Sequence, residues 1–242
     1  MLDHLAIATA RLADALPVLV GRLGGVPESG GPGDGFRWAC WRYEGGGCIE
    51  ALEPAGEGGF LHRFLATRGP GVHHVTFTVP DLDRACARAA GVGYRIVGRD
   101  DSDPDWRVAY LHPKEALGLV VQLAQASGRD KRRPWAVPAG PAPAPPPARV
   151  LGLRTRARSR ERADAQWGRA LGGRPVEGRA GAIRYRWPPS PMHVAVEIAP
   201  DADEGPVAIE LGPAPHAGPH AGLPSGPVPP LGVAFVTGSG EI

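Results

Sequence analysis

The chain has 242 residues, with 27 Lys and Arg against 25 Asp and Glu, which gives a formal net charge of +2. This length suits one or two domains, and the nearly balanced charge argues against a polyanion-binding function, so we expect no nucleic-acid partner. The 35 glycines and 28 prolines together exceed a quarter of the residues, which is high for a globular protein.

The first 54 residues predict a β-α-β-β-β arrangement. Leucines at helical spacing follow the first strand, and a pair of glycines after Leu23 ends the helix. Pro17 inside this helix predicts a kink or a late start, because proline has no backbone N–H to donate. The expected elements are a strand over 2–9, a helix from Leu12 to Leu23, a loop at 30–33, and strands over 36–43 and 48–52.

Residues 71–125 repeat this arrangement after a short bridge. Apolar side chains over 60–65 predict a short helix in the bridge. Asp81 is expected to be the N-cap of the next helix, because an aspartate side chain accepts a hydrogen bond from the first turn. The remaining expected elements are strands over 71–79, 94–97, 107–111 and 119–123.

The two copies carry polar groups at matching positions, which indicates an internal repeat. His4 and His74 each stand near the start of the first strand, and Glu50 and Gln122 follow 46 and 48 residues later on the last strand. Residues two apart on a strand share a face, so each histidine shares its face with small residues. If these faces line one cavity, there is room in it for an ion and a ligand.

The remainder of the chain begins with a break in the pattern. Residues 126–148 contain a charged run and then an almost pure Pro/Ala stretch, which predicts an extended linker. Residues 149–242 read as a degenerate third copy and the start of a fourth. In this reading Glu210 stands in the position of Glu50, whereas glycines replace the two histidines. Those glycines are Gly152 and Gly232.

The three cysteines, Cys40, Cys48 and Cys86, show no paired spacing. We interpret them as small buried apolar residues with reduced thiols. There is no apolar run of membrane-spanning length and no evident signal peptide. We therefore expect a cytoplasmic protein without a membrane partner.

The ordered set of motifs resembles the vicinal oxygen chelate superfamily, which includes glyoxalases, bleomycin resistance proteins and dioxygenases. The resemblance is nearest to its methylmalonyl-CoA epimerase and glyoxalase I branches, and it is good over residues 1–125 and weak over 149–236. The motifs that carry it are Leu2–Ala8, Ile49–Pro54, Phe64–Gly69, Gly71–Phe77, and Leu111–Lys114 followed by Gly118–Leu123.

The resemblance implies an α+β fold in which paired βαβββ modules curl around a divalent metal ion. One residue from each of four strands would hold the ion, and the matching positions here are His4, Glu50, His74 and Gln122. Two imidazoles and a carboxylate suit Zn, Ni, Co, Fe or Mn, and an amide oxygen is a weaker fourth ligand. Two open positions would receive substrate oxygens, so the ion would act as a Lewis acid.

Gln122 departs from the family pattern, because both branches usually place a glutamate there. In those branches this position has a catalytic part in proton transfer, and a neutral amide has no basic site at neutral pH. The loop before Phe36, where epimerases supply another catalytic glutamate, contains Asp34. Asp34 is therefore our substitute for the catalytic base, and metal binding is expected to survive better than isomerase chemistry.

The resemblance predicts three domains or segments: a glyoxalase-like metal-binding domain over 1–125, the linker over 126–148, and a degenerate glyoxalase-like domain over 149–242. The expected function is that of a metal-dependent lyase or isomerase acting on a small acyl-thioester, hemithioacetal or dicarbonyl substrate. A metal-dependent dioxygenase and a resistance-type small-molecule-binding protein are the alternatives, since this fold supports many chemistries. A small-molecule substrate is the expected partner, and homodimerisation is left open.

Overall fold

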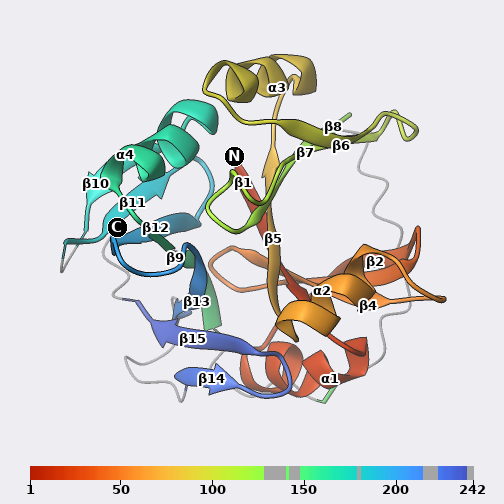
Figure 1. Cartoon of the computed structure of the whole chain (residues 1–242). Helices are drawn as coiled ribbons and strands as arrows, with labels where there is room; N and C mark the ends of the chain where they lie inside the picture. The colour runs from red at the N-terminus through yellow and green to blue at the C-terminus, as the bar shows by residue number, and fades with distance from the viewer. Residues whose placement is uncertain (128–139, 142–147, 179–180, 215–222, 239–242) are drawn as a thin grey trace. The chain divides into compact units, whose positions relative to one another are not determined.

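The computed structural model describes residues 1–127, 140–141, 148–178, 181–214 and 223–238. Most of the predicted linker over 126–148 lies outside these described residues. The structure consists of two mixed β-sheets with few helices (Figure 1). The elements up to residue 78 are β1 (Leu2–Ala8), α1 (Leu12–Leu16), a π-helix (Pro17–Arg22), β2 (Val26–Gly33), β3 (Phe36–Arg42), β4 (Cys48–Pro54), α2 (Phe60–Arg68) and β5 (Gly71–Thr78).

The later elements complete the first sheet and form the second. They are α3 (Leu82–Gly91), β6 (Ile96–Asp100), β7 (Trp106–Leu111), β8 (Val120–Ala126), β9 (Ala148–Ala157), α4 (Arg160–Ala163), a second π-helix (Asp164–Ala170), β10 (Arg174–Glu177), β11 (Ile183–Arg186), β12 (His193–Ile198), β13 (Gly205–Pro213), β14 (Gly226–Val228) and β15 (Val233–Thr237). The eight-stranded sheet has the order β2-β3-β4-β1-β5-β8-β7-β6, and the seven-stranded sheet has the order β10-β11-β12-β9-β13-β15-β14.

The first sheet confirms the predicted fold class. It is built from two βαβββ modules, the first ending with β4 and the second running from β5 to β8, with each module's first strand parallel to its last. The registers of the two modules match: Ala6 lies opposite Glu50, and Thr76 lies opposite Gln122. Ala6 and Thr76 each follow a histidine by two residues, and Glu50 and Gln122 lie opposite them on the neighbouring strand. The equivalent positions of the two modules therefore match, as the repeat predicted.

The C-terminal copies are arranged differently from the sequence prediction. β9 to β12 form a complete third module, because β12 pairs in parallel with β9 as β4 pairs with β1. β13 then pairs in parallel with β15, as β5 pairs with β8. Glu210 therefore lies on the first strand of a short fourth copy and does not match Glu50, and Gly232 precedes the last strand. The strand pairing therefore defines where the third copy ends and the fourth begins. The degenerate sequence motifs had placed this boundary too late in the chain.

Pro17 marks the place where the first helix changes its hydrogen bonding. The α-helix ends at Leu16, and a π-helix continues from Pro17 to Arg22. Proline cannot donate the backbone hydrogen bond that would continue the α-helical ladder, so the change of helix type at this residue has a direct cause. Helix α3 begins as predicted, because the Asp81 side chain accepts a hydrogen bond of 2.9 Å from the backbone N–H of Arg84.

The stretch around Gly30–Gly33 was expected to be a loop, but it belongs to strand β2. This strand pairs antiparallel with β3, from Val26 opposite Arg42 to Gly33 opposite Phe36, with one irregularity between Pro27 and Ser29. β2 is at the edge of its sheet. Edge strands tolerate glycine and proline because one side of the backbone needs no partner strand.

The cysteine prediction was wrong for two of the three residues. Cys40 and Cys48 form a disulfide between β3 and β4, and Cys86 is a buried free cysteine. The β3–β4 register places Cys40 opposite Glu50 and Cys48 opposite Arg42, so the two cysteines are diagonal neighbours. A spacing of eight residues in the chain becomes a contact only because a hairpin folds the two strands together.

The chain divides into two compact units, and each unit contains segments from both halves of the sequence. The first unit comprises Met1–Asp3, His74–Lys131 and Gly152–Val207. Inside it, Phe77 packs edge-on against Trp187, with the ring centroids 4.8 Å apart, and also contacts Trp167 at 6.4 Å. These large rings anchor the second module against the third within that unit.

The second unit comprises His4–His73, Arg132–Leu151 and Ala208–Ile242. Inside it, the backbone N–H of Ala148 donates to the carbonyl of Leu23 over 2.8 Å. Pro70 lies so close to Gly232 that a side chain at Gly232 would collide with its backbone. The C-terminal strands of this unit therefore pack against the first module without room for a larger residue at that contact.

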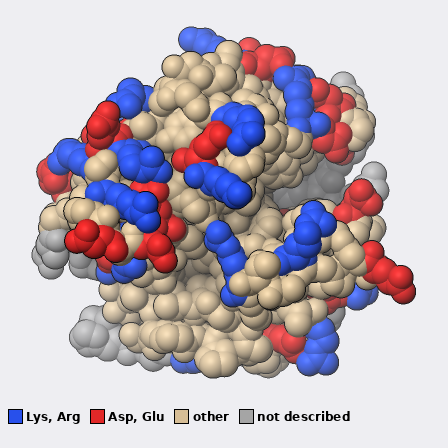
Figure 2. All heavy atoms as spheres, in the orientation of Figure 1, with Lys and Arg blue, Asp and Glu red and all other residues tan. Residues whose placement is uncertain are grey.

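The charged side chains on the face drawn in Figure 2 are of both signs and lie interspersed. Ion pairs in the described part of the chain include Arg99 with Asp101 and Arg162 with Glu204. None of the helices in the described ranges combines the length and the apolar character that crossing a membrane would require.

Candidate metal centre

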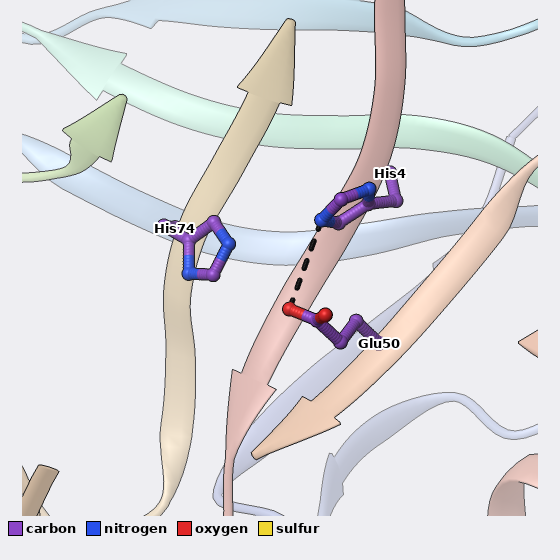
Figure 3. Close-up of side chains that lie close together, drawn as sticks. All are labelled: His4, Glu50 and His74. Carbon is purple, nitrogen blue, oxygen red and sulfur yellow. Dashed lines mark ion pairs between the residues drawn. The ribbon is translucent and has the colours of Figure 1, made fainter. Parts of the chain in front are cut away.

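Three side chains that the sequence repeat singled out converge in the structure. The ligand atoms of His4, Glu50 and His74 all lie within 4.8 Å of one another (Figure 3). His4 Nε2 is 3.7 Å from Glu50 Oε2. All three residues are buried, with 7–8% of their surface exposed. Two imidazoles and one carboxylate thus face a common point in a site that is nearly closed to water.

Strand geometry explains why these residues meet. His4 is on β1, His74 is on β5, and Glu50 is on β4, which is the parallel neighbour of β1. Ala6 is directly opposite Glu50 and is fully buried. Because residues two apart share a face, this small side chain lies beside His4 and leaves space above the sheet for the longer ligands.

Gln122 lies on the same face of its module as His74. It is opposite Thr76 on β5, and Thr76 is two residues from His74. The Thr76 hydroxyl donates to the Gln122 amide oxygen over 2.6 Å, and the Gln122 amide nitrogen donates to the Tyr110 hydroxyl over 3.0 Å. The second lone pair of the amide oxygen is compatible with a further bond, so the two contacts orient Gln122 without preventing metal ligation.

Thr76 and Tyr110 are site residues that sequence reasoning did not assign. The sequence pattern marks Thr76 only as one of the small residues that share a face with His74, and it marks Tyr110 only as part of the strand expected over 107–111. Tyr110 lies directly opposite Gln122 in the β7–β8 register. Opposite residues of an antiparallel pair share a face. The pairing of β7 with β8 would therefore have identified Tyr110 as a neighbour of Gln122.

An apolar cluster adjoins the ligands on the first module. Its buried residues include Ala6, Ala8 and Leu52, which follow His4 and Glu50 along the same strand faces. The cluster also contains Leu61, and the partly buried side chains that pack against it are Phe36, Trp38, Phe64 and Leu65. The surroundings of the ligands on this side are thus aliphatic and aromatic.

His73 differs from its neighbour His74 in its environment. Its ring packs against Phe64 and Phe60, with centroids 4.8 and 5.4 Å away. Burial, assisted by the positive charge of Arg68, lowers the pKa of His73 to about 4. His73 is therefore neutral at neutral pH and belongs to an aromatic packing contact, as expected for the residue on the opposite face of the strand.

Asp34 is not brought near the three ligands. It lies exposed in the turn between β2 and β3, beyond Phe36. Phe36 is opposite Pro54, whereas Glu50 is opposite Cys40, four residues further along β3. Four residues of strand span roughly 13 Å. This position does not support a direct part for Asp34 in proton transfer at the cluster.

The donor set fits a divalent transition metal. Imidazole nitrogens and a carboxylate oxygen are ligands for Zn, Ni, Co, Fe and Mn, and three protein ligands are typical of catalytic sites that keep open positions. The close approach of His4, Glu50 and His74 brings three such ligand atoms together. The chemistry of the residues therefore agrees with a divalent metal ion.

A family comparison finds a match over the N-terminal part of the chain. Residues 3–110 match the family described as the Glyoxalase/Bleomycin resistance protein/Dioxygenase superfamily. The chain is 35% identical over 81 residues to an ethylmalonyl-CoA/methylmalonyl-CoA epimerase from Cereibacter sphaeroides. That match covers 32% of this chain and 60% of the relative, so the chain spans less than two thirds of the relative's length.

Two solved structures give similar matches. A methylmalonyl-CoA epimerase from Mycobacterium tuberculosis is 30% identical, with 52% of this chain and 87% of that chain covered and a TM-score of 0.48. A methylmalonyl-CoA epimerase variant from Streptomyces coelicolor in complex with 2-nitronate-propionyl-CoA is 25% identical, with 53% and 95% covered and a TM-score of 0.48.

Proposed function

We propose that the protein is a metal-dependent isomerase of small acyl-thioesters. The proposal starts from the match of residues 3–110 to the Glyoxalase/Bleomycin resistance protein/Dioxygenase superfamily. The observation that carries the proposal is the convergence of His4, Glu50 and His74 within 4.8 Å. These three residues would hold the ion, with Gln122 as an oriented fourth ligand. The ion would supply Lewis-acid chemistry, which lowers the cost of negative charge on a substrate carbonyl oxygen.

An acyl-thioester is favoured over the other carbonyl substrates for two reasons. The curated relative that is 35% identical over 81 residues is an epimerase of ethylmalonyl-CoA and methylmalonyl-CoA. In addition, Ala8, Leu52 and the cluster around them give the site an apolar side. Such a surface excludes water from the reacting carbon and receives an aliphatic acyl group better than it receives a polar one.

The residues of the second module orient the site. The Thr76 hydroxyl and the Tyr110 hydroxyl fix both ends of the Gln122 amide. Because Gln122 offers no basic site, it holds its ligand or substrate in place and does not remove the proton itself. Tyr110 brings a hydroxyl group to the same face, and phenols serve as general acids and bases in other enzymes. We therefore expect slow proton exchange.

Deuterium exchange tests this proposal directly. The full chain, loaded in turn with Co, Zn, Ni or Mn, is incubated with methylmalonyl-CoA in deuterated buffer, and incorporation at the carbon between the two carbonyl groups is followed by mass spectrometry. We expect metal-dependent exchange above the rate without enzyme. The matched control is His74→Ala, which should exchange at the background rate. Background exchange by the wild-type protein with every metal would refute the isomerase function.

A metal-dependent dioxygenase is the second candidate, and one specific observation favours it. Two histidines and one carboxylate, as in the cluster of His4, Glu50 and His74, are the ligand set of many non-haem Fe(II) oxygenases. Oxygen consumption by the Fe(II)-loaded protein with catechol-type substrates, measured beside the exchange assay, separates the two functions. Oxygen uptake without deuterium exchange would favour the dioxygenase.

A further inference from the structure

A second group of metal-ligating side chains lies on β2, β3 and β4 and shares no residue with the first. The ligand atoms of Glu28, Cys40 and Cys48 all lie within 4.8 Å of one another. All three residues belong to the same compact unit, and both cysteines are buried. Sγ of Cys48 is 3.9 Å from Oε2 of Glu28. In the structure the two sulfur atoms are joined in a disulfide.

We propose that reduction of the Cys40–Cys48 disulfide creates a thiolate-rich site for a zinc-class divalent ion, with Glu28 as the third ligand. The reductant is a dithiol, which supplies two electrons and two protons. It leaves as a cyclic disulfide, while Cys40 and Cys48 become thiols. The divalent ion then binds both sulfur atoms as thiolates, and two protons pass to the solvent.

The distances fit such an ion. With a Zn–S bond of about 2.3 Å, a Zn–O bond of about 2.1 Å and tetrahedral geometry, a sulfur and an oxygen ligand lie roughly 3.6 Å apart. The present separation of Cys48 Sγ and Glu28 Oε2 is 3.9 Å, which is close to this distance. The Cα atoms of the cysteines are 6.7 Å apart, at the wide end of the disulfide range of about 4.4–6.8 Å. Side-chain rotation therefore separates the reduced sulfur atoms without moving the strands.

The charges around the site also fit. The Arg42 Nε donates to Glu28 Oε1 over 2.5 Å, which holds the carboxylate and leaves Oε2 facing the sulfur atoms. Two thiolates and one carboxylate carry three negative charges, and Arg42 with a divalent ion carries three positive charges. The occupied site is neutral, so its burial does not leave an uncompensated charge in the protein interior.

The two metal sites lie close together on the sheet, which determines the design of the test. Cys40 is opposite Glu50 in the β3–β4 register, and Glu50 belongs to the first cluster. A metal count on the wild-type protein would therefore mix the two sites. The double variant His4→Ala/His74→Ala removes two of the first cluster's three ligands and leaves Glu28, Cys40 and Cys48 intact.

Cobalt is the probe, because cobalt bound to thiolates absorbs in the near ultraviolet and cobalt bound to imidazole and carboxylate does not. The full-length double variant is reduced with a dithiol, freed of it without oxygen, and titrated with Co²⁺. After reduction, we expect the thiolate absorption to rise with added Co²⁺ and to level off at one equivalent of Co²⁺ per protein. Before reduction, we expect no thiolate absorption. Added Zn²⁺ should abolish the absorption, since thiolates prefer zinc.

Cysteine variants in the same background assign the absorption. Cys40→Ser should lose it, and circular dichroism would verify that this variant remains folded. Cys86→Ser is the matched control and should keep it. Glu28→Gln should weaken cobalt binding without removing the thiolate absorption. The proposal is overturned if the reduced double variant shows no thiolate absorption, if Cys40→Ser retains it, or if the oxidised protein binds cobalt equally well.

Discussion

Thr76 donates its hydroxyl hydrogen to the amide oxygen of Gln122 over 2.6 Å, across two parallel strands of the second module. In the first module the corresponding pair is Ala6 and Glu50, in which the alanine has no group to donate. The two modules therefore have the same register at this pair of positions but differ in the side chains that occupy it. One module presents a carboxylate beside His4, and the other presents an amide whose orientation two hydroxyl groups fix.

The first prediction concerns the replacement of this amide. Gln122→Glu keeps the shape of the side chain and adds a basic oxygen at the position where related enzymes usually have one. General-base catalysis is worth roughly 10² to 10⁴ in rate, so we expect deuterium exchange into methylmalonyl-CoA to accelerate by about that factor with the same metal bound.

The control for Gln122→Glu is Gln125→Glu on the same strand. Gln125 is three residues further along β8, so its side chain lies on the opposite face, where it accepts a hydrogen bond from the backbone N–H of Leu82. This variant makes the same change in net charge and should exchange at the wild-type rate. Equal acceleration by both variants would indicate a general charge effect instead of a new base.

The second prediction is that His4→Ala and His74→Ala each remove most of the bound metal. Each change deletes one of only three closely spaced ligands in the cluster with Glu50. Elemental analysis of the purified variants provides the measurement. His62→Ala is the control, because His62 contacts the Gly56 carbonyl on the surface, and its metal content should match the wild type. Retention of metal by both cluster variants would contradict the site.

The third prediction tests the orienting part of Thr76. Thr76→Val preserves the shape of the side chain but removes the donor to Gln122. Loss of a group that orients a metal ligand typically costs about 10- to 100-fold in metal affinity. Competition with a chromophoric chelator measures this affinity. Thr78→Val is the matched control, since its hydroxyl contacts the Met1 carbonyl and not a ligand. Equal affinities for the two variants would remove Gln122 from the ligand set.

The fourth prediction concerns packing inside the first compact unit. Phe77 is 1% exposed and contacts Trp187 and Trp167. Truncating a buried phenylalanine typically costs about 3–5 kcal/mol of unfolding free energy. We expect Phe77→Ala to lose this amount in urea unfolding. Phe60→Ala should lose much less, because Phe60 is 41% exposed. Similar losses in the two variants would contradict the packing.

The fifth prediction concerns the proposed boundary at the linker. Residues 1–125 contain all four ligand positions, so the truncated protein should still bind metal. It lacks Trp167 and Trp187, however, so Phe77 loses the rings that pack against it. Burial of a phenylalanine side chain contributes about 1.5–3 kcal/mol to the unfolding free energy. We therefore expect the truncation to bind one metal ion and to unfold at lower urea than the full chain. A metal-free truncation would indicate that the C-terminal half completes the site.

Much of the site was predictable from the sequence because its signals are local. The alternating pattern that follows His4 and His74 defines a strand and its face without knowledge of the partner strands. The spacing to Glu50 and Gln122 then identifies the last strand of each module. The N-cap at Asp81 was predictable for the same reason, since its hydrogen bond spans three residues.

The features that escaped prediction depend on which strands pair. The Cys40–Cys48 disulfide follows from the β3–β4 register, which the spacing of the cysteines does not reveal. The part played by Tyr110 follows from its position opposite Gln122. Glu210 was misassigned because only the parallel pairing of β13 with β15 identifies β13 as the first strand of the fourth copy.

The composition of the compact units has a consequence for how the chain is synthesised. The unit that contains His4–His73 also contains Ala208–Ile242. A ribosome adds about 5–20 residues per second, so the first module emerges roughly 7–27 s before the strands that complete its unit. During that interval its apolar surfaces lack their final partners. Contacts that join segments so distant in the chain are also slow to form, so the nascent N-terminal module exposes apolar surface until the last strands have been synthesised.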